Sequence, residues 1–184
     1  MRTGTRPYLA YELHPTSTAQ KPPTHLYRHD LESLFYVFFL LVTVHDLQRI
    51  SKEEPPRFEL VLQPDTDCYR WFSLDDELLN LKKNALLTNP LTLAPTSTFT
   101  ELGGILRKFH GRISMGLSAR SQFQNRAEDA SMAQSVRSTG RKIRGKPVEE
   151  AQSFDDATLG GYFTYDNVMD AFLLLAPFKL EEQY

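Results

Sequence analysis

The fold class follows from one apolar run, Leu31-Glu32-Ser33-Leu34-Phe35-Tyr36-Val37-Phe38-Phe39-Leu40-Leu41-Val42-Thr43-Val44. The run contains neither glycine nor proline, and Asp30 precedes it, where a carboxylate can accept the amide hydrogens of a first helical turn. Its β-branched and aromatic side chains would also suit a strand, but its length and the capping acid favour a helix. Apolar positions lie all around this helix, so it should be buried on every side. We therefore expect a mainly α fold around a central helix at 31–44.

Length and composition limit the class of protein. The 184 residues suit one domain, and 41% apolar with 24% charged residues permits a hydrophobic core. The net charge of −2 argues against a nucleic-acid binder with a broad basic surface. The single cysteine, Cys68, excludes an internal disulfide. No signal peptide is visible, and the longest apolar stretch, 34–42, is shorter than the ~18–20 residues of a membrane span. We expect an intracellular protein, cytoplasmic or nuclear, without a membrane partner.

Further elements are expected on both sides of the central helix. The proline-rich residues 1–25 should be irregular, with one short helical turn near 8–13. Residues 58–62 could form either a short strand or an extended segment. A helix should start at Ser73 and stop at Asn89-Pro90, with one apolar face made by Leu74, Leu78, Leu81 and Ala85.

Two helices are expected in the second half of the chain. Thr98 and Glu101 have the spacing of a capping box, and the helix that they begin carries an apolar stripe formed by Phe99, Leu102, Leu106, Phe109 and Ile113. A last helix should cover 166–175.

The segment 114–150 differs from the rest. It has few large apolar residues and seven basic ones, namely Arg120, Arg126, Arg137, Arg141, Lys142, Arg144 and Lys146. Such a composition cannot bury enough apolar area to offset the entropy of ordering, so we expect a mobile insertion. The basic cluster at 141–146 is either a solvated loop or a nuclear-import or polyanion patch.

The sequence contains no glycine-rich phosphate loop and no Gly-x-Ser-x-Gly nucleophile elbow. His25, His29 and Asp30 could ligate a metal, with His14 and Asp166 as further candidates, but nothing in their spacing requires a metal site. Arg28-His29-Asp30-Leu31 is superficially similar to a kinase catalytic loop. However, Glu32 and Phe35 stand where that loop needs lysine and asparagine, so we reject this interpretation.

Two other segments resemble a different part of the kinase fold. Gly4-Thr5-Arg6-Pro7-Tyr8-Leu9-Ala10-Tyr11-Glu12 is similar to the end of an activation segment, with Ala10-Tyr11-Glu12 in place of Ala-Pro-Glu. Downstream, Asp30-Leu31-Glu32-Ser33-Leu34 is similar to the start of the large central helix of a kinase C-terminal lobe. Together they most resemble the fungal-type protein kinases, sometimes called FunK1. The specific resemblance covers 2–42.

The resemblance implies roles for individual residues. Gly4, Thr5 and Tyr8 would form the substrate-docking loop, in which Thr5 favours Ser/Thr acceptors. Glu12 would pair with a buried arginine from a later part of the lobe, unless it is simply an exposed surface acid. Asp30 would hold the backbone of the catalytic loop, because a carboxylate at the head of a buried helix needs several amide donors.

The family activity is Ser/Thr phosphorylation with ATP and Mg²⁺, and its glycine-rich loop, lysine and catalytic and metal-binding aspartates all lie upstream of the matching residues. We therefore expect residues 1–184 to form a partial, C-lobe-only domain that begins in the activation segment. It should have no catalytic, cofactor-binding or metal-binding residues of its own and be inactive alone. Its partners would be a protein substrate or the upstream kinase segment. The alternative is a stand-alone helical interaction module or a decoy.

Overall fold

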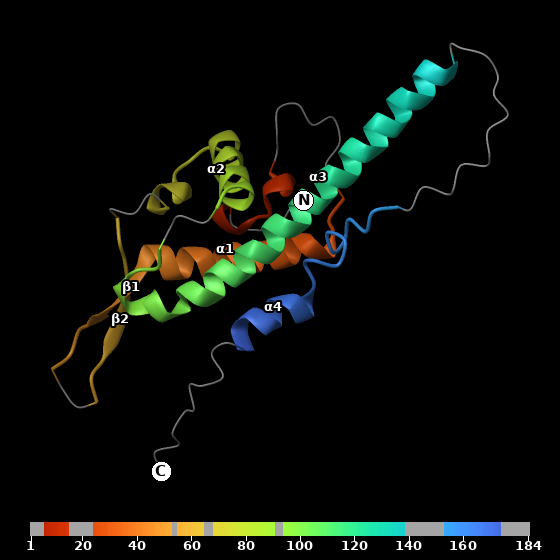
Figure 1. Ribbon diagram of the computed structural model, residues 1–184. Coiled ribbons are helices and arrows are strands. Elements are labelled where there is room, and N and C mark those ends of the chain that lie inside the picture. Colours follow the sequence, from red (N-terminus) through yellow and green to blue (C-terminus); the bar gives the residue numbers. More distant parts are fainter. Residues whose placement is uncertain are drawn as a thin grey trace.

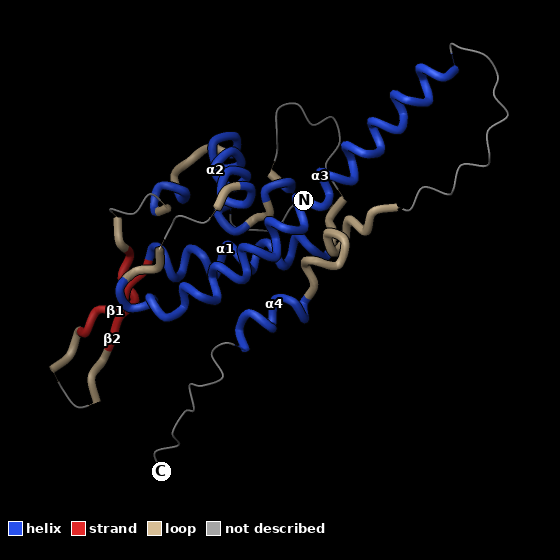
Figure 2. Tube along the Cα trace, in the orientation of Figure 1, coloured by secondary structure: helices blue, strands red, loops and turns tan. Residues whose placement is uncertain are grey.

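The computed structural model describes residues 6–14, 24–52, 55–64, 68–90, 94–138 and 153–173, and it confirms a mainly α fold (Figures 1 and 2). The α-helices are α1 (Tyr27–Val44), α2 (Asp76–Thr88), α3 (Gly103–Ser138) and α4 (Tyr165–Phe172). The 3-10 segments are η1 (Arg6–Tyr8), η2 (Tyr11–Leu13), η3 (Tyr69–Phe72) and η4 (Ser97–Leu102). Strands β1 (His45–Arg49) and β2 (Phe58–Leu62) pair as an antiparallel hairpin.

The core is built around α1. In Figure 1, α3 crosses α1, with α2 on one side of α3 and α4 on the other. Phe35, Tyr36 and Phe39 of α1 are fully buried. Phe35 packs edge-on against Phe109 of α3, with ring centroids 5.3 Å apart, and Phe39 lies 5.6 Å from the ring of Trp71. None of the helices in the described part of the chain combines the length and apolar character that crossing a bilayer requires.

The beginning of α1 and one of its faces differ from expectation. The helix already begins at Tyr27, and the amide of Leu26 donates to His29 Nδ1 at 3.0 Å. Asp30 therefore lies inside the first turn and does not cap the helix. Leu34, Val37 and Leu41 are 43%, 46% and 36% exposed. The expectation that α1 is buried on every side is wrong for this face.

The buried face of α2 is also not the expected one. The helix begins at Asp76 and not at Ser73, because the side chain of Asp75 accepts the amide hydrogen of Leu78 at 2.8 Å. Its buried residues are Leu79, Lys83 and Leu87. Leu78 and Leu81, expected in the core, are 48% and 60% exposed. A pattern of leucines could not reveal this face because its central member is a lysine.

The segment before α3 forms a 3-10 helix and not the first turn of an α-helix. Thr98 does not cap this segment through Glu101. Its hydroxyl instead donates to Asp46 of β1, whose other carboxylate oxygen accepts from Ser97 at 2.8 Å. The predicted stripe that continues into α3 is confirmed, since Leu106, Phe109 and Ile113 are buried. Residues 58–62 form the strand β2, one of the two forms that the sequence allows.

Residues 114–138 are helical and do not form a loop. They continue α3 from Gly103 to Ser138, and Figure 1 shows this end of the helix extending away from the other elements. The residues from Leu117 to Ser138 include no glycine and no proline and are rich in alanine, glutamine and arginine, which favour a helix even without burial. The remaining residues of the expected insertion, 139–150, include the basic cluster 141–146 and lie outside the described residues.

A tight turn before α4 packs against α3. Leu159, Gly160 and Gly161 have positive φ angles of 52°, 70° and 83°. A Cβ atom on Gly116 of α3 would lie only 2.6 Å from Leu159 Cβ, so the helix and the turn approach closely. The last helix is confirmed as α4, whose N-cap Thr164 accepts the amide hydrogen of Asn167 at 3.2 Å.

Candidate functional site

The N-terminal segment 6–14 is folded onto the helices. It forms η1 and η2, which agree with the short helical turn expected near 8–13. Pro7, Ala10 and Leu13 are buried, so every third residue of the segment points into the protein. Three apolar anchors of this size could not hold nine residues in one conformation, and the segment is also fixed by two groups of buried polar contacts.

The first group surrounds Glu12. Arg28 Nη2 of α1 donates to Glu12 Oε2 at 2.7 Å, and Arg120 Nη1 of α3 donates to Glu12 Oε1 at 2.5 Å. The hydroxyl of Tyr11 also donates to Glu12 Oε1, at 2.9 Å. The side chain of Glu12 is only 19% exposed. Glu12 is therefore an internal ion-pair acceptor and not an exposed surface acid.

Asp156 completes this ion-pair cluster. Its carboxylate lies 3.3 Å from Arg28 Nη2 and 2.8 Å from Arg120 Nε. The cluster of Glu12, Arg28, Arg120 and Asp156 thus joins η2, α1, α3 and the turn before α4. Arg28 is 2% exposed, and a charge so deeply buried is tolerated only because both carboxylates face it.

The charges of this cluster stabilise the ionised form of Glu12. Burial alone would raise the pKa of Glu12, but the contacts with His29 and Arg28 and the charges of Arg28 and Arg120 hold that pKa well below its usual range. His29 Nε2 lies 3.5 Å from Glu12 Oε2, a long contact. Glu12 stays ionised down to strongly acidic pH, so the cluster is a permanent structural link.

The second group surrounds Glu32 and Lys83. Glu32 Oε1 accepts the backbone amide hydrogen of Tyr11 at 2.7 Å and the hydroxyl hydrogen of Tyr36 at 2.8 Å. Lys83 Nζ donates to the backbone oxygens of Leu9 and, at 3.2 Å, of Arg6. These bonds clamp the backbone of segment 6–14 between α1 and α2.

The neighbours of Lys83 extend this clamp. Lys83 Nζ also lies 3.0 Å from His14 Nε2 and 4.3 Å from the centre of the Tyr36 ring. His14 Nδ1 is 3.4 Å from Asp76, which also accepts from Arg6 Nε at 2.8 Å. Burial raises the pKa of Glu32 to about 7 and lowers the pKa of Lys83 to about 7. Both groups therefore titrate near neutral pH.

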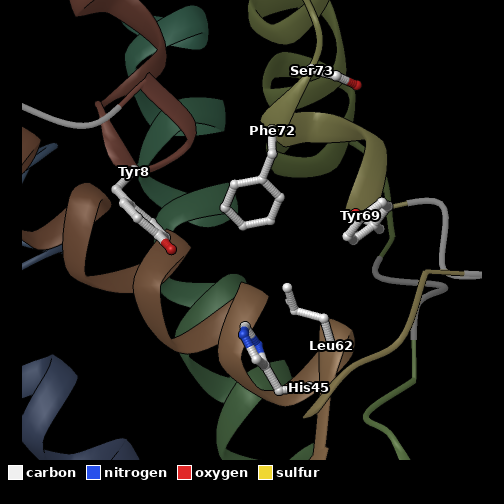
Figure 3. Close-up of a pocket in the computed structure, with 6 residues that line it drawn as sticks. All are labelled: Tyr8, His45, Leu62, Tyr69, Phe72 and Ser73. Carbon is white, nitrogen blue, oxygen red and sulfur yellow. The ribbon is translucent and has the colours of Figure 1, made fainter. Parts of the chain in front are cut away.

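An apolar pocket opens beside the clamped segment. It has a volume of about 320 Å³ and is lined by Tyr8, His45, Leu62, Tyr69, Phe72 and Ser73. Figure 3 shows the side chains of Tyr8, Phe72, Leu62 and His45 around a common space, while Ser73 points away from it. The rings of Tyr8 and Phe72 meet edge to face, with centroids 6.3 Å apart. The pocket can accept a bulky apolar side chain.

The structure brings only part of the sequence-predicted site together. Tyr8 lines the pocket and Glu12 lies in the ion-pair cluster. Gly4 and Thr5 lie outside the described residues. Asp30 belongs to neither group: its side chain is 68% exposed and contacts His25 Nε2 at 3.3 Å. Among the described residues no three His, Cys, Asp or Glu side chains gather in a way that could hold a metal.

Sequence reasoning missed the residues that anchor the segment. The composition of 114–150 predicts a mobile insertion that would contain Arg120, and the predicted apolar face of α2 does not include Lys83. One signal was present: Arg28 and Glu32 lie one helical turn apart in a helix that is otherwise apolar, and both are buried. Charged residues on the inner face of such a helix indicate buried partners, although the sequence does not identify them.

Part of the chain is similar to a known protein family. A family model described as fungal protein kinase matches residues 1–42, which include η1, η2 and most of α1. No curated protein and no solved structure matches the chain. The N-terminal part of the chain is thus similar to fungal protein kinases, whereas the remaining residues have no matched relative.

Proposed function

We propose that this chain is the substrate-docking part of a fungal-type Ser/Thr protein kinase lobe, and that by itself it transfers no phosphate. In the family, phosphate passes from ATP, with Mg²⁺, to a protein hydroxyl. The 184 residues contain no Gly-x-Gly-x-x-Gly loop. In this proposal the nucleotide-binding and catalytic residues belong to another kinase segment, which packs against this chain.

The observation that carries the proposal is the exposed face of α1 within the matched residues 1–42. Tyr27, Leu34, Val37 and Leu41 are 45%, 43%, 46% and 36% exposed and follow one another at helical spacing. Apolar residues so regularly exposed on the central helix of a domain indicate a covering partner.

Asp30 lies on the same face as these apolar residues. Its exposed carboxylate has spare acceptor capacity beyond its contact with His25. It could therefore accept backbone amide hydrogens from the covering segment. This is the role that the family resemblance gives to Asp30.

Substrate would dock at the segment 6–14 and the residues before it. The clamp of Glu32 and Lys83 fixes the backbone on both sides of Tyr8, so the ring of Tyr8 is held at the edge of the pocket. A rigid loop beside an apolar pocket can select a substrate by one side chain at little entropic cost. Gly4 and Thr5 would continue this docking loop towards the phosphate acceptor.

The proposal is tested by supplying the missing chemistry in trans. The purified chain, labelled ATP, Mg²⁺ and a Ser/Thr peptide should give no labelled product. A fungal kinase segment that carries the glycine-rich loop and the catalytic and metal-binding aspartates should bind the chain. Val37→Glu should weaken this binding about tenfold or more, because it places a charge on the apolar face of α1.

Leu81→Glu is the matched control, since Leu81 is 60% exposed but lies on α2. It should bind the kinase segment as tightly as the unchanged chain. Labelled product above a buffer control from the chain alone would contradict the expected inactivity. Equal binding by the Val37→Glu and unchanged chains would contradict the covering role of α1.

A second function is favoured by a different observation. Phe35, Tyr36, Phe39 and Leu40 of α1 are fully buried by the protein's own elements, so most of the core is complete. With such a core, the chain could fold as a stand-alone helical interaction module that needs no kinase segment. This second function would be favoured if the chain melts cooperatively as a monomer and does not bind the kinase segment.

A further inference from the structure

The exposed apolar face of α1 has a counterpart on α4. Tyr165, Met169 and Leu173 are 56%, 39% and 64% exposed, and because they follow one another every four residues, they lie on one side of α4 and of the residue that ends it. Val168 and Ala171, on the inner side of this helix, are fully buried. Helix α4 therefore has an apolar side that stays exposed in the described part of the chain.

A contact between two phenylalanines joins α4 to α1. The rings of Phe38 and Phe172 meet edge to face, with centroids 5.3 Å apart. Leu34 and Leu41 lie one helical turn on either side of Phe38, and Met169 lies one turn before Phe172. The exposed side chains of the two helices therefore flank this contact.

The two helices run in the same direction. The turn that precedes α4 lies at the start of α1, where the carbonyl oxygen of Ala157 accepts the amide hydrogen of Arg28 at 3.1 Å. The end of α4 lies beside the middle of α1 (Figure 1). The exposed residues of both helices thus form one apolar surface, called the α1–α4 surface, which consists of Leu34, Val37, Leu41, Tyr165, Met169 and Leu173.

The exposed charges on α1 and α4 are all negative. The exposed charged side chains of the two helices are those of Asp30, Asp166 and Asp170. The other ionisable side chains of the same helices apart from the tyrosines, namely Arg28, His29 and Glu32, are buried. An occupant of the α1–α4 surface therefore meets carboxylates and no exposed ammonium or guanidinium group from these helices.

Two of the three carboxylates border the α1–α4 surface. Asp30 lies one helical turn before Leu34, and its side chain is 68% exposed although it contacts a histidine. Asp166 follows the first residue of α4 and is also exposed. Asp170 lies on the edge of α4 that faces α3, where its backbone oxygen accepts from Lys108 Nζ at 2.8 Å.

The chemistry of this surface determines which form of occupant fits it. Between their ends, α1 and α4 close their backbone hydrogen bonds internally, so the surface offers apolar side chains and no free N–H or C=O group. An extended segment would bury its own backbone groups there without partners, which is costly. A helix satisfies its backbone internally and can pack its side chains between those of two neighbouring helices.

We propose that the α1–α4 surface binds a basic amphipathic helix of a partner protein. The helix packs its apolar side chains on the surface, and lysine or arginine side chains at the edges of its apolar stripe face Asp30 and Asp166. From Asp30 to Leu41 the surface extends over eleven positions, or about 17 Å, which corresponds to about three turns of the bound helix.

The inference rests on the proposed function in so far as this helix belongs to the covering kinase segment. It adds the form and charge of the covering element. It also extends the covered surface to α4, which lies outside the matched residues 1–42.

The charge of the α1–α4 surface argues against two other occupants. In a symmetric pair of copies the same surface of both chains would meet, so Asp30 and Asp166 of both copies would gather at one interface without a cation from these helices. Like charges brought together in an interface oppose association. An anionic lipid surface would be repelled by the same carboxylates. The surface therefore points to a basic partner.

The probe is the fluorescein-labelled peptide Lys-Leu-Lys-Ala-Leu-Leu-Gln-Lys-Leu-Lys-Ala-Leu-Leu-Gln, whose binding to the full chain is followed by fluorescence anisotropy. The same peptide with glutamate in place of every lysine keeps the apolar stripe and should bind at least about tenfold more weakly. The peptide with proline in place of its first glutamine cannot form one continuous helix and should also bind at least about tenfold more weakly.

A pair of variants tests the apolar part of the surface. Met169→Lys places a repelling charge on α4 and should weaken binding of the basic peptide about tenfold or more. Leu60→Lys is the matched control, because Leu60 is 44% exposed but belongs to another exposed apolar face, which Phe58, Leu60 and Leu62 form on the β1–β2 hairpin. It should change binding less than about twofold.

A second pair of variants tests the charges. The double variant Asp30→Asn, Asp166→Asn should weaken binding of the basic peptide about tenfold at low salt and remove most of its salt dependence. Asp170→Asn is the matched control on the other edge of α4 and should change binding less than about twofold. All the substituted residues are exposed, so the variants should keep the circular dichroism spectrum of the unchanged chain.

Several outcomes would overturn the proposal. Equal binding of the basic and acidic peptides would exclude the role of the carboxylates, and equal binding of the proline peptide would exclude a bound helix. If the chain forms a dimer in sedimentation that Met169→Lys dissociates, the occupant is a second copy and the proposal is wrong.

The proposed function and this inference fail in different ways. If Val37→Glu weakens binding of the kinase segment but Met169→Lys changes neither that binding nor peptide binding, the proposed function stands and the inference is wrong. If no kinase segment binds but the basic peptide binds with the expected variant effects, the proposed function is wrong and the α1–α4 surface still takes a basic helix.

Discussion

Arg28 is the residue on which the ion-pair cluster depends. It is 2% exposed and faces both Glu12 and Asp156. We predict that Arg28→Ala lowers the free energy of unfolding by about 3–5 kcal/mol, because it leaves buried carboxylates without a counter-charge. Urea denaturation measures this change. Arg126→Ala, which removes an exposed arginine from α3, is the control and should change stability by less than about 0.5 kcal/mol. Equal effects of the two substitutions would refute the structural role of the cluster.

Glu32 should make stability depend on pH. Burial raises its pKa to about 7 from an ordinary 4.5, so the folded state holds a proton that the unfolded state has released between these values. Stability from this group is present below pH 4.5 and is lost as pH rises to about 7. The loss is at most about 3 kcal/mol.

Glu32→Gln keeps an oxygen acceptor for Tyr11 and Tyr36 but cannot ionise. We predict that its stability relative to the unchanged chain rises between pH 5 and pH 8, as measured by urea denaturation at each pH. Lys83 contributes the opposite trend at higher pH, since its pKa is lowered to about 7, but comparing the two chains at one pH largely cancels this contribution. A constant difference across the range would show that Glu32 titrates normally.

Among the elements, α3 has two halves with different energetics. Its first half packs on α1, α2 and α4, whereas residues 124–132 are exposed throughout. The second half is helical because its residues favour the helix, and an isolated helical end is only marginally stable in water. Breaking it should therefore cost little.

Two matched alanine substitutions test this division of α3. Ala119→Pro, in the half-buried part, should lower the free energy of unfolding by about 3 kcal/mol or more. Ala130→Pro, in the exposed part, should cost less than about 1 kcal/mol and instead reduce the helical circular dichroism signal. If Ala130→Pro destabilised the protein as much as Ala119→Pro, the exposed half would have tertiary contacts that the structure does not show.

For the whole molecule, the two uncovered apolar surfaces should dominate behaviour in solution. They are the α1 face at Leu34, Val37 and Leu41 and the hairpin face at Leu60 and its neighbours. We predict that the isolated chain binds a hydrophobic dye and scatters light at high concentration. The double variant Val37→Glu, Leu60→Glu should reduce both signals without lowering the melting temperature. A chain that binds no dye would mean that these faces are covered in solution.

The local elements could be predicted from the sequence because their signals are local. The apolar run at 31–44 predicts α1, the residues at 58–62 are compatible with β2, and the stripe from Phe99 to Ile113 predicts the packed half of α3. Glu12, Asp30 and Tyr8 were found by resemblance to a family motif, and two of them lie in the sites described above. The amino-acid sequence is sufficient for each of these predictions, because each pattern is formed by residues that lie close together in the sequence.

Burial and pairing could not be predicted, because both depend on residues distant in the chain. Lys83 can be buried because its ammonium group donates hydrogen bonds to the carbonyl oxygens of Leu9 and Arg6, which are more than seventy positions away in the sequence. Arg120 is ordered since Glu12 and Asp156 face it. Leu81 and Val37 are exposed despite their hydrophobicity, because no described element packs over them. An amphipathic pattern indicates that a helix has an inner face, but the partners that satisfy a buried charge exist only after folding brings them together.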